Sequence, residues 1–238
     1  MNTRNVLTVR SMRRLPLPLL AAAAVFGASV VSAPSAAAEP CPDVEVVFAR
    51  GSGEPTGIGG IGRPFVDALR SQIGAKSLTV YAVNYPASTD FDNPAFPATV
   101  IDGIRDASSH IESMVANCPN TREVLGGYSQ GAAVAGYTTS AAVPPGVPAA
   151  KVPPPMPADI ANHVAAVALF GTPSGQFLQK YNAPPLAIGP LYQPKTIQLC
   201  AAEDPVCVSG GGGGLAAHTS YPANGMTNQA ADFVSSRL

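Results

Sequence analysis

One short segment of the chain has the residues of an activated serine. Residues 124–134 read VLGGYSQGAAV, and Gly127-Tyr128-Ser129-Gln130-Gly131 within them spells G-x-S-x-G. Where this pattern joins a buried strand to a helix, the serine occupies a tight turn that only small neighbours permit. An apolar run precedes Ser129 and small residues follow it, so we expect Ser129 to be the nucleophile of an acyl transfer.

A serine hydroxyl reacts only when a base removes its proton, and the base needs an acid to orient it. The chain has three histidines. We expect His110, within a helix, and His163, just before a strand, to have surface or packing roles. His218 follows the last predicted strand and is the candidate base.

The candidate acid lies between the serine and that histidine. Asp204, in CAAEDPVC, gives the chain order Ser, Asp, His, which is the order of the α/β-hydrolases. Glu203 is the rival acid, and spacing alone does not exclude it.

Five short apolar runs alternate with helical patterns. The runs are nearly continuous in apolar character, as in strands covered on both faces, and the alternation predicts a parallel sheet between two layers of helices. The expected strands are 44–49, 78–83, 122–126, 164–170 and 196–199, and the expected helices are 64–73, 101–117, 132–142 and 226–238.

Four cysteines allow three pairings of two disulfides, and an even number is typical of an exported chain. Cys41 and Cys118 each precede a strand, so in a parallel sheet both lie at one edge. Cys200 follows the last strand, at the opposite edge, with Cys207 nearby. Cys41–Cys118 and Cys200–Cys207 are therefore the pairs that need no crossing of the sheet. The spacing does not favour a metal site.

Residues 46–62, a β-branched run that leads into a glycine-rich loop, raise a different possibility. Gly57, Gly59 and Gly62 spell G-x-G-x-x-G, the pattern of a dinucleotide loop. Such a loop starts directly after its strand and is followed by an acidic residue about 20 positions on. Neither condition is met. We expect the loop instead to supply Ser52 to an oxyanion hole, together with the backbone N–H of Gln130.

The first 38 residues have the pattern of an export signal. Four arginines precede an apolar stretch, and three alanines end at residue 38. The stretch is short and broken by prolines, which argues against a membrane anchor. The remaining residues, 39–238, form one predicted domain with ten basic and fifteen acidic residues. That balance disfavours nucleic acid as a partner. We expect a secreted monomer without an obligate protein partner, and retention in the cell wall stays open.

These motifs resemble the cutinase family of serine esterases, in its exported actinobacterial branch. The resemblance covers nearly all of 39–238 and is carried by FARGSGE, GYSQGAAV, CAAEDPVC and HTSY. It implies a compact αβα sandwich with about five parallel strands and no metal or organic cofactor. It also implies Ser129, His218 and Asp204 as the triad, with Ser52 and Gln130 as the oxyanion hole, and it favours Asp204 over Glu203.

The resemblance implies hydrolysis of carboxylic esters of short to medium fatty acyl chains. Residues 85–97 and 177–192 are apolar and aromatic enough to contact the acyl chain. The alternatives are a phospholipase, a thioesterase or an acyltransferase with the same triad, or an exported surface protein without activity.

Two segments depart from the family pattern. Five glycines at 210–214 replace apolar residues that the family tends to place beside the acyl chain, and we expect them to form a featureless tether. They make a strong preference for cutin polymer doubtful. Residues 143–157, VPPGVPAAKVPPPMP, are expected to form a surface loop at the sheet edge far from Ser129.

Overall fold

The computed structural model describes residues 40–238. The predicted export signal, residues 1–38, lies outside the described residues.

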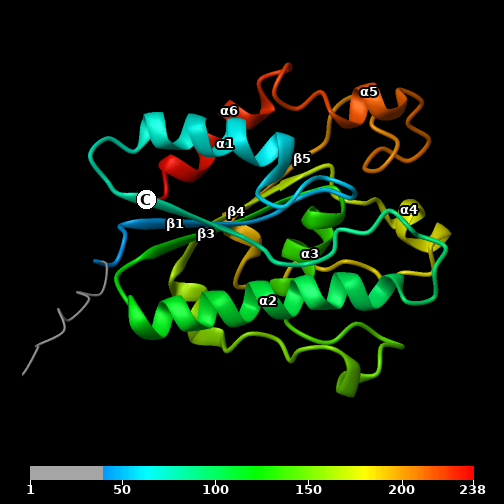
Figure 1. Ribbon diagram of the computed structural model, residues 1–238, viewed down its shortest axis with the longest axis horizontal. Helices are drawn as coiled ribbons and strands as arrows, with labels where there is room; N and C mark the ends of the chain where they lie inside the picture. The colour runs from blue at the N-terminus through cyan, green and yellow to red at the C-terminus, as the bar shows by residue number, and fades with distance from the viewer. Residues whose placement is uncertain (1–39) are drawn as a thin grey trace, which may run out of the picture. The chain divides into compact units, whose positions relative to one another are not determined.

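A central sheet of five parallel strands organises this part of the chain (Figure 1). The strand order is β2-β1-β3-β4-β5. The strands are β1 (Val44–Ala49), β2 (Leu78–Ala82), β3 (Arg122–Tyr128), β4 (Val164–Phe170) and β5 (Thr196–Leu199). The predicted α/β sandwich is confirmed, and the expected strand limits differ only at the ends of β2 and β3.

Helices cover both faces of the sheet (Figure 1). One face carries α1 (Gly59–Gln72) and α6 (Met226–Ser235), and the other carries α2 (Phe96–Asn117) and α3 (Gln130–Thr138). The short elements are α4 (Gly175–Lys180), α5 (Gly214–His218), η1 (Ala149–Lys151), η2 (Ala158–Asn162) and η3 (Gln193–Lys195).

Two helices begin five residues earlier than predicted. Pro64 was expected to open its helix, but α1 starts at Gly59 and Pro64 lies inside it. The Gly60 N–H donates to the Glu54 carboxylate at 2.6 Å, so a side chain outside the helix satisfies a backbone donor of the first turn. Helix α2 starts at Phe96 with Pro97 in its first turn, where a missing N–H costs nothing. The expected ends of α3 and α6 were too late by four and three residues.

The core has two parts because the sheet is apolar on both faces. On the α1 and α6 side, Phe48, Phe65 and Phe170 are fully buried, with ring centroids 5.6–6.4 Å apart. On the other side, Leu125 and Ile111 are fully buried. Continuous burial of β1 and β4 explains why neither run alternates between polar and apolar residues.

Two disulfides join the pairs that the topology predicted. Cys41 bonds to Cys118 and Cys200 to Cys207, with Cα atoms 5.5 and 5.8 Å apart. The first joins the segments that lead into β1 and β3. The second closes a loop after β5. Within residues 40–238, no helix has both the length and the hydropathy that a membrane span requires.

The strand order places the reactive residues. The chain runs from β1 outward to β2 and then returns to the other side of β1 as β3. In open parallel sheets, ligands bind at the carboxyl ends of the strands where the order reverses in this way. Ser52 follows β1 and Ser129 follows β3, so both lie at this switch point.

An acidic pair is buried in neighbouring strands. Glu45 on β1 and Glu123 on β3 are paired in register and are 6% and 1% exposed. The Glu45 carboxylate lies 2.9 Å from Nε2 of His110, whose ring stacks on Tyr81. Burial, together with the neighbouring Glu45 carboxylate, raises the pKa of Glu123 to about 8. Glu123 is therefore protonated in the folded protein at neutral pH.

We predict that this group makes the protein less stable as the pH rises. In the unfolded chain Glu123 ionises near its ordinary pKa of 4.5, whereas in the folded protein it holds its proton up to about pH 8. Its contribution is therefore fully present below pH 4.5 and is lost as the pH rises through 8. Glu123→Gln removes this loss and should raise the free energy of unfolding at pH 8 by on the order of a few kcal/mol.

Urea unfolding at pH 5 and pH 8 measures the effect. Asp67→Asn is the control, because Asp67 is an exposed carboxylate paired only with Arg70 within the described chain. The same pH dependence in Glu123→Gln and in the wild type would contradict the prediction.

Candidate active site

Ser129 lies on a strained turn between β3 and α3. Its backbone has φ 56° and ψ −118°, a conformation that costs free energy in a residue with a side chain. The two flanking glycines permit it. A Cβ at Gly127 would lie 2.1 Å from the carbonyl oxygen of Gly131, and a Cβ at Gly131 would lie 2.0 Å from that of Ala49. The G-x-S-x-G spacing is thus a packing requirement of this turn.

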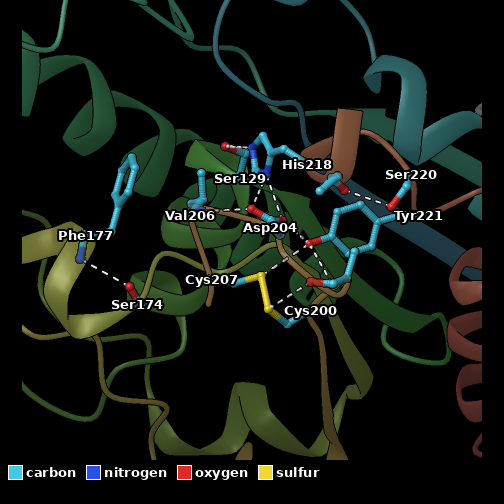
Figure 2. Close-up of a disulfide and its surroundings, with 12 residues drawn as sticks. Ser129, Ser174, Phe177, Cys200, Asp204, Val206, Cys207, His218, Ser220 and Tyr221 are labelled. Atoms are coloured by element: carbon cyan, nitrogen blue, oxygen red, sulfur yellow. Dashed lines mark hydrogen bonds and ion pairs between the residues drawn. A yellow bond between two sulfur atoms is a disulfide. The ribbon is translucent and has the colours of Figure 1, made fainter. Parts of the chain in front are cut away.

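Three side chains distant in sequence meet above the sheet (Figure 2). Nε2 of His218 lies 2.8 Å from Oγ of Ser129. Nδ1 of the same ring lies 2.8 Å from each carboxylate oxygen of Asp204. Ser129 comes from the turn after β3, Asp204 from the loop after β5, and His218 from the end of α5. A serine can therefore pass a proton to an imidazole that a carboxylate orients.

Asp204 is fully buried and held by several donors. The Tyr221 hydroxyl donates to it at 2.5 Å and the Val206 N–H at 2.8 Å. Burial alone would raise the pKa of Asp204, but the hydrogen bonds from Tyr221, His218 and Val206 outweigh it, so the pKa lies below its usual value. The carboxylate stays ionised at neutral pH and can stabilise a charged imidazole.

The rival acid and the other histidines lie elsewhere. Glu203 is exposed, has a φ of 64°, and its carbonyl oxygen accepts the Gly213 N–H. His110 packs against Glu45 and Tyr81, and a ring nitrogen of His163 lies 3.1 Å from the carbonyl oxygen of Pro119. In residues 40–238, no three His, Cys, Asp or Glu side chains converge as metal ligands would.

Two tyrosines position the histidine and the acid. The Tyr128 hydroxyl donates to the carbonyl oxygen of His218 at 2.8 Å, and its ring centroid lies 4.9 Å from the imidazole. Tyr221, fully buried, bonds Asp204 and also accepts the Ala201 N–H at 3.3 Å. Both tyrosines fall within motifs that the sequence analysis identified, GYSQG and HTSY. A tyrosine in either motif does not by itself indicate that its hydroxyl positions the histidine or the acid.

Two glycines of the 210–214 run are closely packed, which corrects the expectation that the whole run is a featureless tether. A Cβ at Gly211 would lie 2.6 Å from the carbonyl oxygen of Asp204, and one at Gly213 would lie 2.5 Å from Cβ of Ala217. The run approaches the acid loop more closely than a chain with side chains could. Glycine spacing alone could not indicate this, because the contact depends on the fold of both loops.

The glycine-rich loop after β1 surrounds a carboxylate of the protein itself. The Gly51 and Gly60 N–H groups donate to the two oxygens of Glu54, both at 2.6 Å. Arg50 donates to the carbonyl oxygens of Glu54 and Tyr85, at 2.9 and 2.7 Å. These bonds fix the backbone around Ser52. Sequence analysis missed Glu54 and Arg50, although both lie in the FARGSGE motif.

The two predicted oxyanion residues border Ser129. The Ser52 hydroxyl is buried and has no hydrogen-bond partner within the described chain. The Gln130 side chain donates to the carbonyl oxygen of Ser88 at 3.2 Å, and its backbone amide begins α3. All three residues line one cavity. An unpartnered hydroxyl and a helix-terminal amide are suitable donors for an oxygen that gains charge.

The Cys200–Cys207 disulfide encloses the acid. Asp204 lies within the bridged loop, and Sγ of Cys207 is 3.5 Å from the Tyr221 hydroxyl (Figure 2). The bridge therefore limits movement of both Asp204 and the tyrosine that donates to it.

The cavity at Ser129 measures about 880 Å³. Phe91 and Phe96 from the predicted acyl-contact segment 85–97, and Phe177 and Tyr181 from segment 177–192, line it. Residues of the 143–157 segment line it as well, which corrects the prediction that this segment lies far from Ser129. The segment starts at the far edge of the sheet, but it returns along α2 and α3 before β4, and the sequence does not specify that path.

Comparison with known proteins identifies the family. The Cutinase family model matches residues 40–238. The protein named "Probable carboxylesterase Culp7" of Mycobacterium tuberculosis is 67% identical over 168 residues, which cover 71% of this chain and 89% of that protein. The "Phospholipase Culp4" of the same organism is 45% identical over 220 residues, covering 91% and 89%.

A solved structure agrees with these sequence matches. The Trichoderma reesei cutinase, in complex with a phosphonate inhibitor, superposes with a TM-score of 0.59 at 31% identity over 82% of this chain and 76% of its own. Together with the five-stranded parallel sheet, these matches show that the chain belongs to the cutinase family.

Proposed function

We propose that this protein is a secreted serine esterase that hydrolyses carboxylic esters of short to medium fatty acyl chains through an acyl-serine intermediate. The observation that carries the proposal is the continuous hydrogen-bonded series from Ser129 through His218 to the buried Asp204. Membership of the cutinase family and the carboxylesterase name of the 67% identical relative support the ester substrate.

In the first half-reaction, the Ser129 hydroxyl oxygen forms a bond to the ester carbonyl carbon while Nε2 of His218 takes its proton. Asp204, hydrogen-bonded to Nδ1, stabilises the imidazolium that results. The carbonyl oxygen becomes an oxyanion, which the Ser52 and Gln130 donors stabilise. The bond to the alcohol then breaks, and His218 returns the proton to the departing alcohol.

Water completes the turnover by the same steps. His218 takes a proton from water as the oxygen attacks the acyl-serine carbonyl, and the second tetrahedral intermediate breaks down to a free acid and a neutral Ser129. The mechanism uses side chains and backbone amides of the protein together with water, and it needs no metal or organic cofactor.

A phospholipase activity is the second candidate, because Culp4, a 45% identical relative, is named a phospholipase. Thioester hydrolysis and acyl transfer to a second alcohol use the same acyl-serine and differ only in the group that leaves or accepts. Secretion is supported by the two disulfides, since such bonds persist in oxidising compartments. We propose no obligate protein partner and a monomeric state.

Replacing the nucleophile tests the enzymatic role. Ser129→Ala should abolish hydrolysis of 4-nitrophenyl butyrate, a loss of at least about 10³-fold in kcat, because nothing else in the site can form the acyl intermediate. It should also abolish covalent labelling by a fluorophosphonate probe. Ser109→Ala, on the exposed side of α2, is the control and should keep both properties. If the wild-type protein neither reacts with the fluorophosphonate probe nor hydrolyses the ester, the protein is a surface protein without catalytic activity.

Removing one hydroxyl tests the positioning of Asp204. Tyr221→Phe should lower kcat about tenfold with little change in KM, because the carboxylate loses a charge-assisted hydrogen bond. That bond lowers the pKa of Asp204, so the loss of kcat that accompanies protonation of Asp204, the acid limb followed in this test, should begin at higher pH in the variant. Tyr192→Phe is the matched control, since the buried Tyr192 hydroxyl has no partner within the described chain. An acid limb that does not move would leave Tyr221 with a packing role only.

Removing each disulfide separates activity from stability. The double variant Cys200→Ala/Cys207→Ala should lose most activity at a temperature where circular dichroism still shows the native fold, because the acid loop relaxes first. The double variant Cys41→Ala/Cys118→Ala should lose roughly 4 kcal/mol of stability, against about 2.5 for the shorter loop, and keep its activity while folded. Loss of activity and of fold at the same temperature in the first variant would refute this order.

A further inference from the structure

The cavity at Ser129 continues well beyond the triad. Besides Ser129, residues of α2, of α3 and of 143–157 line it, and we term residues 143–157 the proline segment. In Figure 1 the proline segment follows α3 and runs along the outer side of α2. We term the part of the cavity between α2, α3 and the proline segment the inner arm.

The α2 side of the inner arm is an apolar stripe. Phe96, Val100, Ile104 and Ser108 line the cavity and recur every four residues, so they lie on one face of the helix. The three apolar members are only half-buried by the protein. Apolar area is thus left available to a ligand inside the fold.

The α3 side closes the inner arm without charge. Ala133, Tyr137 and Thr138 line it. The Tyr137 hydroxyl donates to the carbonyl oxygen of Pro184 at 2.5 Å, and burial raises its pKa to about 12, so it stays neutral. Of the acidic and basic residues, only Glu54, Lys151 and His218 line the cavity in the described part of the chain. The Glu54 carboxylate already accepts hydrogen bonds from the Gly51 and Gly60 N–H groups, so its charge is stabilised by the loop after β1.

The proline segment is a suitable outer wall for an apolar ligand. Five prolines of this segment line the cavity: Pro144, Pro148, Pro153, Pro154 and Pro155. A proline has no N–H, so an apolar chain against this wall leaves few backbone donors without a partner, which would otherwise cost free energy. The chain just before the segment is held by a hydrogen bond from the Ser140 hydroxyl to the carbonyl oxygen of Ala187, and near the end of the segment Met156 packs on the core.

The dimensions match a medium acyl chain. Helix α3 begins beside Ser129, and its run from Gln130 to Thr138 extends about 12 Å at 1.5 Å per residue. An extended chain of single bonds advances about 3.5 Å per three bonds, so roughly ten bonds span this distance. The volume of about 880 Å³ is also within the range of ligand cavities.

We propose that the inner arm binds the apolar tail of a medium-length acyl chain esterified at Ser129, and that the proline segment forms its outer wall and sets the chain-length preference. This rests on the proposed esterase function. A butyryl group occupies only the region near Ser129, whereas a decanoyl group reaches along α3 to the proline segment. Each methylene that leaves water favours binding by up to about fourfold.

The chain has no tryptophan, so one introduced tryptophan reports on the inner arm directly. Val152→Trp places it on the proline segment at a half-buried position that lines the cavity. In a Ser129→Ala background, methyl decanoate should shift its emission to shorter wavelength, and methyl butyrate should not. Ser109→Trp, on the exposed face of α2, is the matched control and should not respond. This measurement does not depend on catalysis, so it tests ligand binding in the inner arm even if the proposed esterase function fails.

Obstruction of the inner arm gives the kinetic test. Ile104→Trp should reduce the ratio of kcat/KM for 4-nitrophenyl decanoate to that for 4-nitrophenyl butyrate at least tenfold. Ser109→Trp should leave the ratio unchanged. An unchanged ratio in a folded Ile104→Trp that hydrolyses butyrate would overturn the proposal and leave the esterase function intact. If the ratio falls in Phe177→Ala but not in Ile104→Trp, the acyl chain lies against Phe177 and not in the inner arm, which also overturns the proposal. In the fluorescence test, an equal emission shift with methyl decanoate in Val152→Trp and Ser109→Trp would overturn the proposal as well.

Discussion

The close approach of Gly131 to the end of β1 is the constraint on which the site depends. With the Cβ position of residue 131 only 2.0 Å from the carbonyl oxygen of Ala49, helix α3 starts directly on the sheet. Ser129 can then project from a strained turn into the space above β1 and β3. The loop after β1 must lie beside that turn, which explains why its backbone is fixed so firmly by Arg50 and Glu54. A wider separation of β1 and α3 would move the serine away from both its donors and its base.

The second half of the site is held by a different kind of structure. His218 and Asp204 lie on loops with little regular structure, since α5 has only five residues. Hydrogen bonds from Tyr128 and Tyr221, the Cys200–Cys207 bridge and the packed glycines restrain these loops. One half of the active site is therefore positioned by the sheet and the other half by covalent and hydrogen-bonded restraints between loops. The free energy that orients the acid comes mainly from local contacts.

The sequence predicts those features that follow from periodicity and spacing. Largely apolar runs identified all five strands, and in β1 and β4 the reason is burial of every position on both faces of the sheet. Ser129 follows β3, and Asp204 and His218 follow β5, so all three lie at the carboxyl edge of the sheet once the strands are parallel. Helix α1 was placed too late because a carboxylate six residues away satisfies its first turn, and no local pattern shows such a contact. The roles of Glu54 and Tyr221 and the path of the proline segment were not predicted either, because they too depend on contacts that no local sequence pattern shows.

The packed glycines have a consequence for comparison with relatives. A side chain at residue 211 or 213 would collide with the backbone of Asp204 or with Ala217. A homologue with bulky residues in this stretch must follow another backbone path between its second bridged cysteine and its histidine. Pairing these positions one by one in an alignment would then equate atoms that occupy different places in space. Loop grafts between such enzymes should exchange the whole bridged loop together with the stretch that follows it, so that acid and histidine stay matched.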